Sequence, residues 1–309
     1  MNIVHATADL KAGSLPICLA IGVFDGVHLG HQRVIRQAVS DAADCRGRSA
    51  VLTFDRHPAA VLAPRRVPPM IYSLARRLDV IASLGPDTAC VLHFDRQFSE
   101  IDGEEFIHSL ARDCGRINSL SVGADFCFGR GRGGNVALLR TLGTELGFAV
   151  HALEQVSLHG HPVSSTRVRE AVRAGHFAQA GEMLGRPYML CAPVVRGMGL
   201  GRQIGVPTAN LDLAGLLTPP VGVYAARALV RGRPCCAAVN IGFRPTVVSD
   251  PALISVEAHL LDFDGEIYGE EIELTFLEKL RDEEKFASLD SLRAQIHRDI
   301  ANAREICRR

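Results

Sequence analysis

Lysine is scarce in this sequence, because the 309 residues contain only Lys11, Lys279 and Lys285. None of the three follows a GxxxxG string, which excludes a Walker A phosphate-binding loop. Any ATP chemistry in this chain must therefore use backbone N–H groups, arginine, histidine and a divalent metal ion.

Neither sign of charge is in excess, since 34 lysines and arginines balance 34 aspartates and glutamates. A chain without excess positive charge lacks the electrostatic footprint of nucleic-acid binding. Long apolar runs are missing as well. Residues 1–13 contain no signal-peptide core, and no later run reaches the roughly 18 apolar residues of a membrane span. We therefore expect a cytoplasmic protein with neither nucleic acid nor a membrane as its partner.

The cysteines form no CxxC pair, although there are nine of them. Their odd number and their scatter through apolar segments favour reduced thiols in the core over disulfides or a zinc site. The positions are 18, 45, 90, 114, 127, 191, 235, 236 and 307.

The first half of the chain alternates short apolar runs with helical patterns. Such alternation predicts an α/β domain with a Rossmann-like, doubly wound parallel sheet that binds ligands at the carboxyl ends of its strands. The expected strands are 17–23, 50–54, 89–94, 120–123 and 148–153, and the expected helices are 32–43, 72–84, 104–114 and 136–147.

The second half has apolar runs separated by turn clusters, which predicts an antiparallel β-barrel or sandwich. Apolar residues at helical spacing between 289 and 303 predict a terminal amphipathic helix lying on it. Gly185 can end a helix and Pro187 prevents its continuation, so we expect domains at 1–185 and 186–309. The expected strands are 189–195, 223–230, 235–241, 253–263 and 271–277.

The most informative stretch is GVFDGVHLGH at residues 22–31, which lies between a predicted strand and a predicted helix. His28 and His31 fall at the helix N-terminus, where free N–H groups and the macrodipole attract an anion. Gly26 and Gly30 let the backbone approach that anion closely. An isolated HxGH string would more often be two surface histidines beside a turn, but the flanking strand and helix favour a phosphate site.

A second candidate phosphate element is SSTRVR at residues 164–169. Its hydroxyls stand where a helix would begin, and Arg169 follows one turn later. Alone, this pattern is also typical of simple helix capping. Aspartates 25, 55, 95 and 125 fall just past predicted strand ends, and we expect Asp95 to be only a turn or cap residue.

The barrel half carries a glycine-rich string, GMGLGRQIGVPTAN, at residues 197–210. Its glycines suggest a loop that approaches a polyphosphate through its backbone, although an ordinary hairpin remains the alternative. Thr208 and Asn210 point to the same face of an extended strand, and their oxygens suit Mg²⁺. Glu257 stands in an apolar strand, where a carboxylate is costly without partners. Alternation along that strand does not tell which face is exposed.

Together these strings resemble the motifs of the bacterial bifunctional riboflavin kinase/FAD synthetases, in the same order and over nearly the whole chain. The further matching strings are TFDRHP (53–58), GADFCFG (123–129), GRPY (185–188), GVYA (222–225), NIGFRPT (240–246) and VEAHLLDFDG (256–265).

The resemblance implies an HxGH-type nucleotidyltransferase domain followed by a riboflavin-kinase barrel. It implies that ATP with Mg²⁺ phosphorylates riboflavin to FMN, and that a second ATP adenylylates FMN to FAD with release of pyrophosphate. The implied catalytic residues are His28, His31, Arg169 and, as the base for the ribityl hydroxyl, Glu257. The residues that the resemblance implies for binding nucleotide and phosphate are Gly22, Phe24, Asp25, Gly26, Gly30, Asp125, Ser164, Ser165, Thr166, Gly197, Gly199, Gly201, Arg202, Gly205 and Pro207. The implied flavin-binding residues are Phe128, Asn240 and Arg281, and the implied metal ligands are Thr208 and Asn210.

Two alternatives remain from the sequence. One is a single-activity member of the family with one inactive half, and the other is a flavin-binding regulator without catalysis. Incubation with riboflavin, ATP and Mg²⁺ separates them, because only a bifunctional enzyme yields both FMN and FAD. Self-association is compatible with the sequence.

Overall fold

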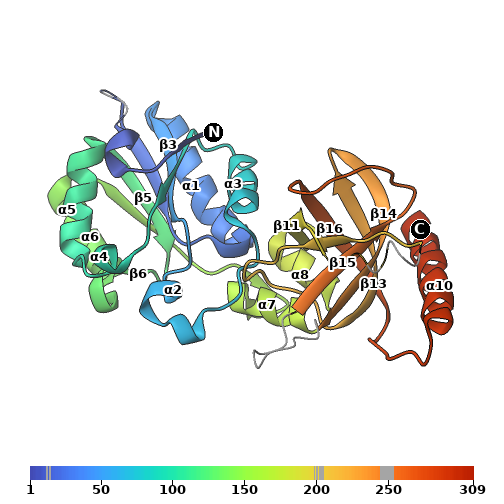
Figure 1. Ribbon diagram of the computed structural model, residues 1–309. Helices are drawn as coiled ribbons and strands as arrows, with labels where there is room; N and C mark the ends of the chain where they lie inside the picture. The colour runs from blue at the N-terminus through green and yellow to red at the C-terminus, as the bar shows by residue number, and fades with distance from the viewer. Residues whose placement is uncertain (12, 14, 198, 200, 202–204, 244–253) are drawn as a thin grey trace. The chain divides into compact units, whose positions relative to one another are not determined.

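The computed structural model describes residues 1–309 apart from 12, 14, 198, 200, 202–204 and 244–253 (Figure 1). Its contacts divide the chain into two compact units. The first consists of Met1–Met70 with Leu74–Ser165, and the second of Ile71–Ser73 with Thr166–Arg309.

The first unit is built on a parallel sheet with strand order β1-β4-β3-β2-β5-β8, which confirms the doubly wound α/β prediction (Figure 1). The chain proceeds from β2 to β3 on one side and reaches β5 on the other, so the topological switch point lies at the carboxyl ends of β2 and β5. The strands are β1 (Asn2–Val4), β2 (Ile17–Ile21), β3 (Arg48–Phe54), β4 (Thr88–Leu92), β5 (Ile117–Gly123) and β8 (Ala149–Leu153).

Helices cover both faces of this sheet, α1 and α3 on one side and α5 and α6 on the other (Figure 1). β2 is buried along its whole length, and its residues alternate between the two cores. This burial explains why the strand is continuously apolar in the sequence. The helices are α1 (Leu29–Cys45), α2 (Ala59–Leu62), α3 (Leu74–Ala82), α4 (Arg96–Ser99), α5 (Gly103–Cys114) and α6 (Val136–Leu146).

Short elements of this unit escaped the sequence analysis. They comprise β1 at the sheet edge, α2, α4, the hairpin β6 (Cys127–Phe128) with β7 (Gly134–Asn135), and the hairpin β9 (Ser157–Leu158) with β10 (His161–Pro162). Elements of two to four residues are too short to show periodicity. The carboxyl of Asp95 accepts the Phe98 N–H (2.7 Å) and caps α4, as expected.

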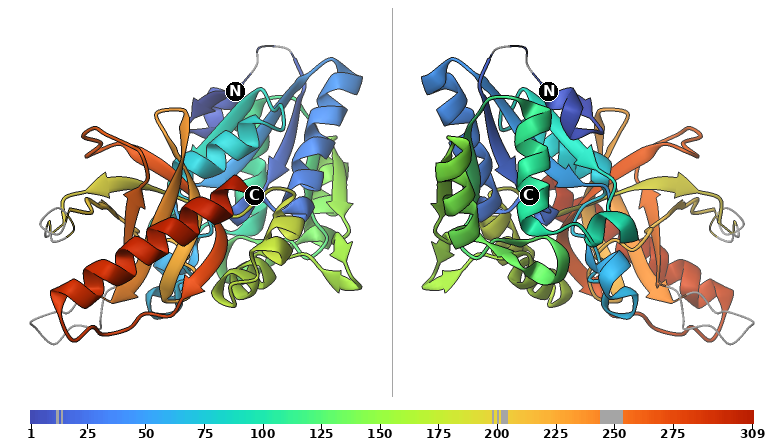
Figure 2. Two further views of the ribbon diagram at one scale, coloured as in Figure 1. Left: turned by 90° about the vertical axis from the view of Figure 1, so that its right-hand side faces the viewer. Right: turned by 90° about the vertical axis from the view of Figure 1, so that its left-hand side faces the viewer.

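The second unit contains a closed antiparallel barrel with strand order β11-β12-β15-β14-β13-β16, so the barrel alternative is confirmed. α10 (Leu289–Arg308) lies along the outside of the barrel against β13, β14 and β16 (Figures 1 and 2). The strands are β11 (Met189–Val195), β12 (Ala209–Leu211), β13 (Gly222–Val230), β14 (Arg233–Phe243), β15 (Ile254–Leu260) and β16 (Glu271–Arg281).

Two helices precede the barrel, α7 (Ser165–Arg173) and α8 (Phe177–Leu184). Gly185 ends α8 in the left-handed conformation (φ 68°), as the sequence predicted. Phe177 of α8 packs against Tyr188, Tyr224 and Phe276, with ring centroids 5.5 to 6.4 Å apart. The last helix before the predicted boundary therefore packs on the barrel.

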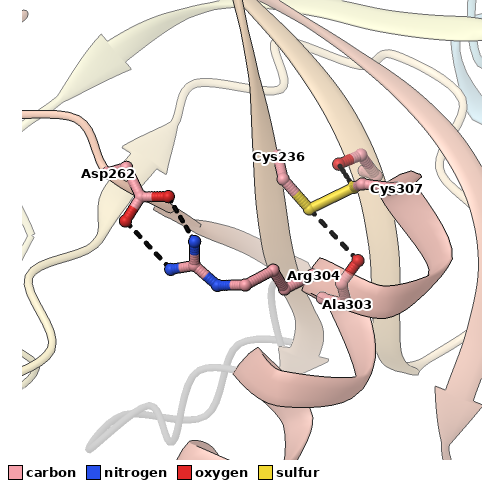
Figure 3. The surroundings of a disulfide bond; sticks show 6 residues. Cys236, Asp262, Ala303, Arg304 and Cys307 are labelled. Atoms are coloured by element: carbon pink, nitrogen blue, oxygen red, sulfur yellow. Dashed lines mark hydrogen bonds and ion pairs between the residues drawn. A yellow bond between two sulfur atoms is a disulfide. The ribbon is translucent and has the colours of Figure 1, made fainter.

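The expectation that the cysteines are reduced core thiols was wrong for one pair. Cys236 of β14 and Cys307 of α10 form a disulfide (Figure 3). The pair escaped the sequence analysis because 71 residues separate its members and only the packing of α10 on the barrel brings them together. The other seven cysteines are free, and burial raises the pKa of the Cys90 and Cys114 thiols to about 12.

Candidate functional site

The loop at residues 22–31, called here the histidine loop, leaves the carboxyl end of β2 at the switch point of the sheet. Its middle, Asp25–Val27, is buried and makes a short 3-10 turn. Gly26 has φ 77°, a conformation open to glycine at little cost. Phe24 also adopts positive φ (53°), and its ring meets that of His31 edge-on at 5.4 Å.

His28 and His31 lie together at the N-terminus of α1, as predicted. Their rings stack with centroids 3.6 Å apart, and the His31 N–H points to His28 Nδ1 (3.4 Å), which makes His28 the N-cap. A ring nitrogen that accepts a hydrogen bond carries no proton, so neutral His28 has its proton on Nε2. That N–H is a donor suited to a phosphate oxygen.

The serine-rich element contacts the histidine loop through Ser165. Ser165 Oγ donates to the backbone carbonyl of Asp25 (2.9 Å). Arg169 is buried in α7 and belongs, with Thr166, to the second unit. Asp125 follows β5 and its carboxyl accepts a hydrogen bond from the Gln155 amide.

A cavity of about 470 Å³, the phenylalanine cavity, adjoins the histidine loop through Gly22 and Val23. This volume is typical of small-molecule sites. Phe128, the predicted flavin contact, lines it and stacks on Phe126 at 5.4 Å. The sequence analysis missed the other aromatic lining residues, which are Phe54, Phe94, Phe98, Phe106 and Phe126.

Asp55 joins the carboxyl ends of two neighbouring strands beside that cavity. Its carboxyl accepts the Phe94 N–H (3.0 Å) and bonds to His93 Nδ1 (2.8 Å). Burial raises the pKa of Asp55, but the hydrogen bonds from Phe94, Arg56 and His93 together outweigh burial and lower it.

In the barrel, three predicted site residues stand side by side across neighbouring strands. Asn210 of β12 pairs in register with Glu257 of β15, and Glu257 pairs with Asn240 of β14. Val223 of β13 continues the row and pairs with Arg281 of β16. We call Asn210, Glu257 and Asn240 the polar row.

The structure also settles which face of β15 is accessible. Val256, Ala258 and Leu260 are buried, whereas Glu257 and His259 are half-buried and line a cavity of about 380 Å³, the barrel cavity. Thr208 lines the same cavity, and its hydroxyl donates to Glu257 Oε2 (3.4 Å).

The glycine-rich segment lies against these polar residues. A Cβ on Gly197 would stand 2.3 Å from Asn210 Nδ2, so any other residue there would displace the Asn210 amide. Gly201 lines the barrel cavity, and the Pro207 carbonyl is 2.8 Å from His259 Nδ1, which holds this segment to β15. Gly199 and Gly205 are among the described residues. Arg202, which was predicted to contact the nucleotide phosphates, lies outside them.

The far wall of the barrel cavity comes from α10. Leu292, Ile296 and Ile300, part of the predicted apolar stripe, line it together with Asp299. Asp299 is buried and makes a forked ion pair with Arg281, in which Nη2 and Oδ2 are 2.8 Å apart. The sequence analysis missed Asp299, because a single acidic residue on an amphipathic helix gives no signal of its buried partner.

Comparisons with known proteins agree with both halves. The FAD synthetase family matches residues 12–167 and the riboflavin kinase family matches residues 184–307. The chain is 36% identical over 306 residues to the bifunctional riboflavin kinase/FMN adenylyltransferase of Pseudomonas fluorescens, covering 99% of this chain and 98% of that one. Against the Escherichia coli K12 enzyme of the same name the identity is 38% over 307 residues, covering 99% and 97%. The chain belongs to the bifunctional riboflavin kinase/FMN adenylyltransferase family.

The same architecture occurs in a crystal structure described as a macrolide-efflux protein from Streptococcus pneumoniae. That structure has a TM-score of 0.82 and 28% sequence identity, and the match covers 98% of this chain and 99% of that one. Within the described residues, none of the helices combines the length and the apolar character needed to cross a bilayer.

As a member of this family, the chain has both activities, which are phosphorylation of riboflavin to FMN and adenylylation of FMN to FAD. Riboflavin, FMN and ATP are the substrates. The single-activity and regulatory alternatives left by the sequence are thereby set aside.

Proposed function

We propose that FMN is adenylylated at the histidine loop and that riboflavin is phosphorylated at the polar row of the barrel. The observation that carries this assignment is the polar row, where Glu257 stands between Asn210 and Asn240 at the wall of a cavity. The motif order of the two matched families supports it for each half.

In the kinase reaction, Glu257 takes the proton of the ribityl 5′-hydroxyl while that oxygen attacks the γ-phosphorus of ATP, and ADP leaves. A half-buried carboxylate beside a hydroxyl donor suits a general base. Asn240 and Arg281 contact the flavin in the barrel cavity.

Thr208 and Asn210 would hold Mg²⁺ in this reaction. Their hydroxyl and amide oxygens are the hard ligands that this ion prefers, and Thr208 and Asn210 both neighbour Glu257. When bound, the ion would offset charge on the nucleotide phosphates. Backbone groups of the glycine-rich segment then approach the same phosphates, and the contributing residues are Gly197, Gly199, Gly201, Arg202, Gly205 and Pro207.

In the adenylyl transfer, a phosphate oxygen of FMN attacks the α-phosphorus of ATP and pyrophosphate leaves, so no covalent enzyme intermediate is needed. His28 and His31 donate hydrogen bonds to the phosphates, and the positive end of the α1 macrodipole adds to the attraction. Phe128 contacts the flavin in the phenylalanine cavity, and Asp125 lies on the nucleotide side. Ser164, Ser165, Thr166 and Arg169 hold the outer phosphates, as the family motif implies.

We place the functional boundary near residues 185 and 186, since every proposed kinase residue follows it and the riboflavin kinase match begins at residue 184. We place the enzyme in the cytoplasm, where ATP is supplied.

A double dissociation of the two activities tests this assignment. His28→Ala should lower FAD formation from FMN by roughly 10²–10³ and leave FMN formation near wild type. Glu257→Gln should lower riboflavin phosphorylation by roughly 10²–10⁴ and leave adenylylation of supplied FMN intact. Both products are quantified by chromatography.

Matched controls are His108→Ala on α5 and Glu278→Gln on the exposed side of β16, and both should leave both rates unchanged. If either site variant, while folded, lost both activities equally, the assignment of the reactions to separate residues would be wrong.

A further inference from the structure

Arg77 of α3 is an unexpected side chain for the interior of this fold. It has 0% exposure and is the largest fully buried side chain among the described residues. A buried guanidinium is costly unless it is paired and hydrogen-bonded. Burial lowers the pKa of Arg77, and the Asp25 and Asp55 carboxylates act in the opposite direction.

The guanidinium bonds to backbone at two strand ends. Nη1 donates to the Val23 carbonyl (2.9 Å), and Nη2 donates to the Phe54 carbonyl. The paired register of β2 and β3 stops at Ile21 and Leu52, so these carbonyls lie where the strands have ceased to pair. Arg77 thus bridges the opening at the ligand-binding edge of the sheet, and Thr53 Oγ1 donates to the same Val23 carbonyl (3.1 Å).

Both carbonyls belong to the candidate adenylyl-transfer site. Val23 begins the turn that leads to His28, and Val23 and Phe54 both line the phenylalanine cavity. We propose that Arg77 is a positioning residue for adenylyl transfer, which fixes the histidine loop at a set distance from the flavin-side wall. This inference rests on the proposed role of the histidine loop.

The charge of Arg77 has a second consequence at this place. Asp25 is 2% exposed within the histidine loop, and Asp55 follows Phe54, so two carboxylates stand near a loop expected to bind a polyphosphate. Arg77 interacts electrostatically with both and offsets part of their negative charge. Its buried Nε has no hydrogen-bond partner among the described residues, so the hydrogen bonds of its guanidinium run through Nη1 and Nη2.

Two substitutions of Arg77 separate the effect of its hydrogen-bonding fork from the effect of its charge. Arg77→Met keeps an apolar stem of similar length and loses charge and donors. Arg77→Lys keeps the charge but loses the planar fork that reaches two carbonyls at once. Since a misplacement of about 1 Å can cost roughly 10² in rate, we expect kcat for FAD formation to fall by about 10²-fold in Arg77→Met and about 10-fold in Arg77→Lys. The KM values for ATP and FMN should change far less.

Leu110→Ala on α5 is the control, because Leu110 is also fully buried but packs in a core cluster that contains no residue of the histidine loop. It should lower the Tm of the first unit and leave kcat near wild type. Rates are measured well below each Tm and normalised to riboflavin kinase activity in the same preparation. A kcat in folded Arg77→Lys equal to that of wild type would overturn the proposal, even if Arg77→Met failed to fold.

His28→Ala in the same assays keeps this inference apart from the proposed function. If His28→Ala retains full FAD formation, the role of the histidine loop is wrong and the Arg77 proposal falls with it. If His28→Ala loses FAD formation while both folded Arg77 variants keep it, only the Arg77 proposal fails.

Discussion

At the scale of single residues, the Thr208 hydroxyl donates a hydrogen bond to the Glu257 carboxylate, and Thr208 lies two residues before Asn210 in the sequence. If Thr208 holds the metal, Thr208→Ala should raise the Mg²⁺ concentration for half-maximal FMN formation by roughly 10-fold or more, the usual effect of losing support at a metal site. Titration of Mg²⁺ at saturating riboflavin and ATP measures this. Thr208→Ser retains the hydroxyl and should behave as wild type; an unchanged requirement in Thr208→Ala would remove Thr208 from the metal site.

Asp55 makes a pH-dependent contribution to stability. Its pKa in the folded protein lies below the ordinary value of 3.8, so the stabilisation is fully present above that value and is lost as pH falls through the lower folded pKa. The difference in free energy of unfolding between wild type and Asp55→Asn should therefore be constant near neutral pH and shrink below about pH 4. Denaturant titrations between pH 7 and 3 measure it, with Asp79→Asn on the exposed side of α3 as control. A difference that grows on acidification would contradict this.

At the scale of elements, α10 is fastened to the barrel near its carboxyl end by two links. One is the Cys236–Cys307 disulfide, and the other is the pair of Arg304 with the Asp262 carboxylate, in which Nη2 and Oδ1 are 2.9 Å apart (Figure 3). Because residues of α10 form one wall of the barrel cavity, we expect these links to stabilise the proposed kinase site as well as the fold.

Removal of the disulfide should therefore lower the stability of the barrel. We expect Cys236→Ser to reduce its free energy of unfolding by about 2–4 kcal/mol in denaturant titrations, since a loop of 71 residues is no longer closed. Cys235→Ser is the matched control, because the adjacent Cys235 is a free thiol. Equal stability of the two variants would show that the disulfide does not contribute in solution.

At the scale of the whole molecule, the relevant question is how much chain the barrel needs. Fragments 184–309 and 166–309 both contain every proposed kinase residue, but only the longer one retains α8. Since Phe177 packs on Tyr188, Tyr224 and Phe276, we expect the longer fragment to be more stable by about 2 kcal/mol, the value for burying one large apolar side chain.

We expect both fragments to phosphorylate riboflavin. Thermal unfolding and FMN production at saturating riboflavin and ATP with Mg²⁺ check this. If fragment 166–309 is folded but makes no FMN, the kinase site depends on the first half of the chain and the boundary proposed near residue 185 does not separate two working modules.

The sequence alone was sufficient for the elements whose residues carry a local signal. β2 is apolar on both faces, α10 repeats its apolar residues every turn, and the strand-to-helix junction at His28 and His31 needs no distant residue to be recognised. The order of the motifs then indicated the family, because each motif is contiguous in the chain.

The tertiary structure alone decided which distant residues meet. The partner of Cys236, the partner of Arg281, and the accessible face of Glu257 all depend on strand register and on how α10 packs, which are long-range properties with no local pattern. The phenylalanine cavity gathers side chains from several separate segments of the chain. Arg77 bonds to the backbone carbonyls of Val23 and Phe54, both of which are distant from it in the sequence. Such contacts form only when the strand ends are brought together by folding of the sheet, so local propensity cannot encode them.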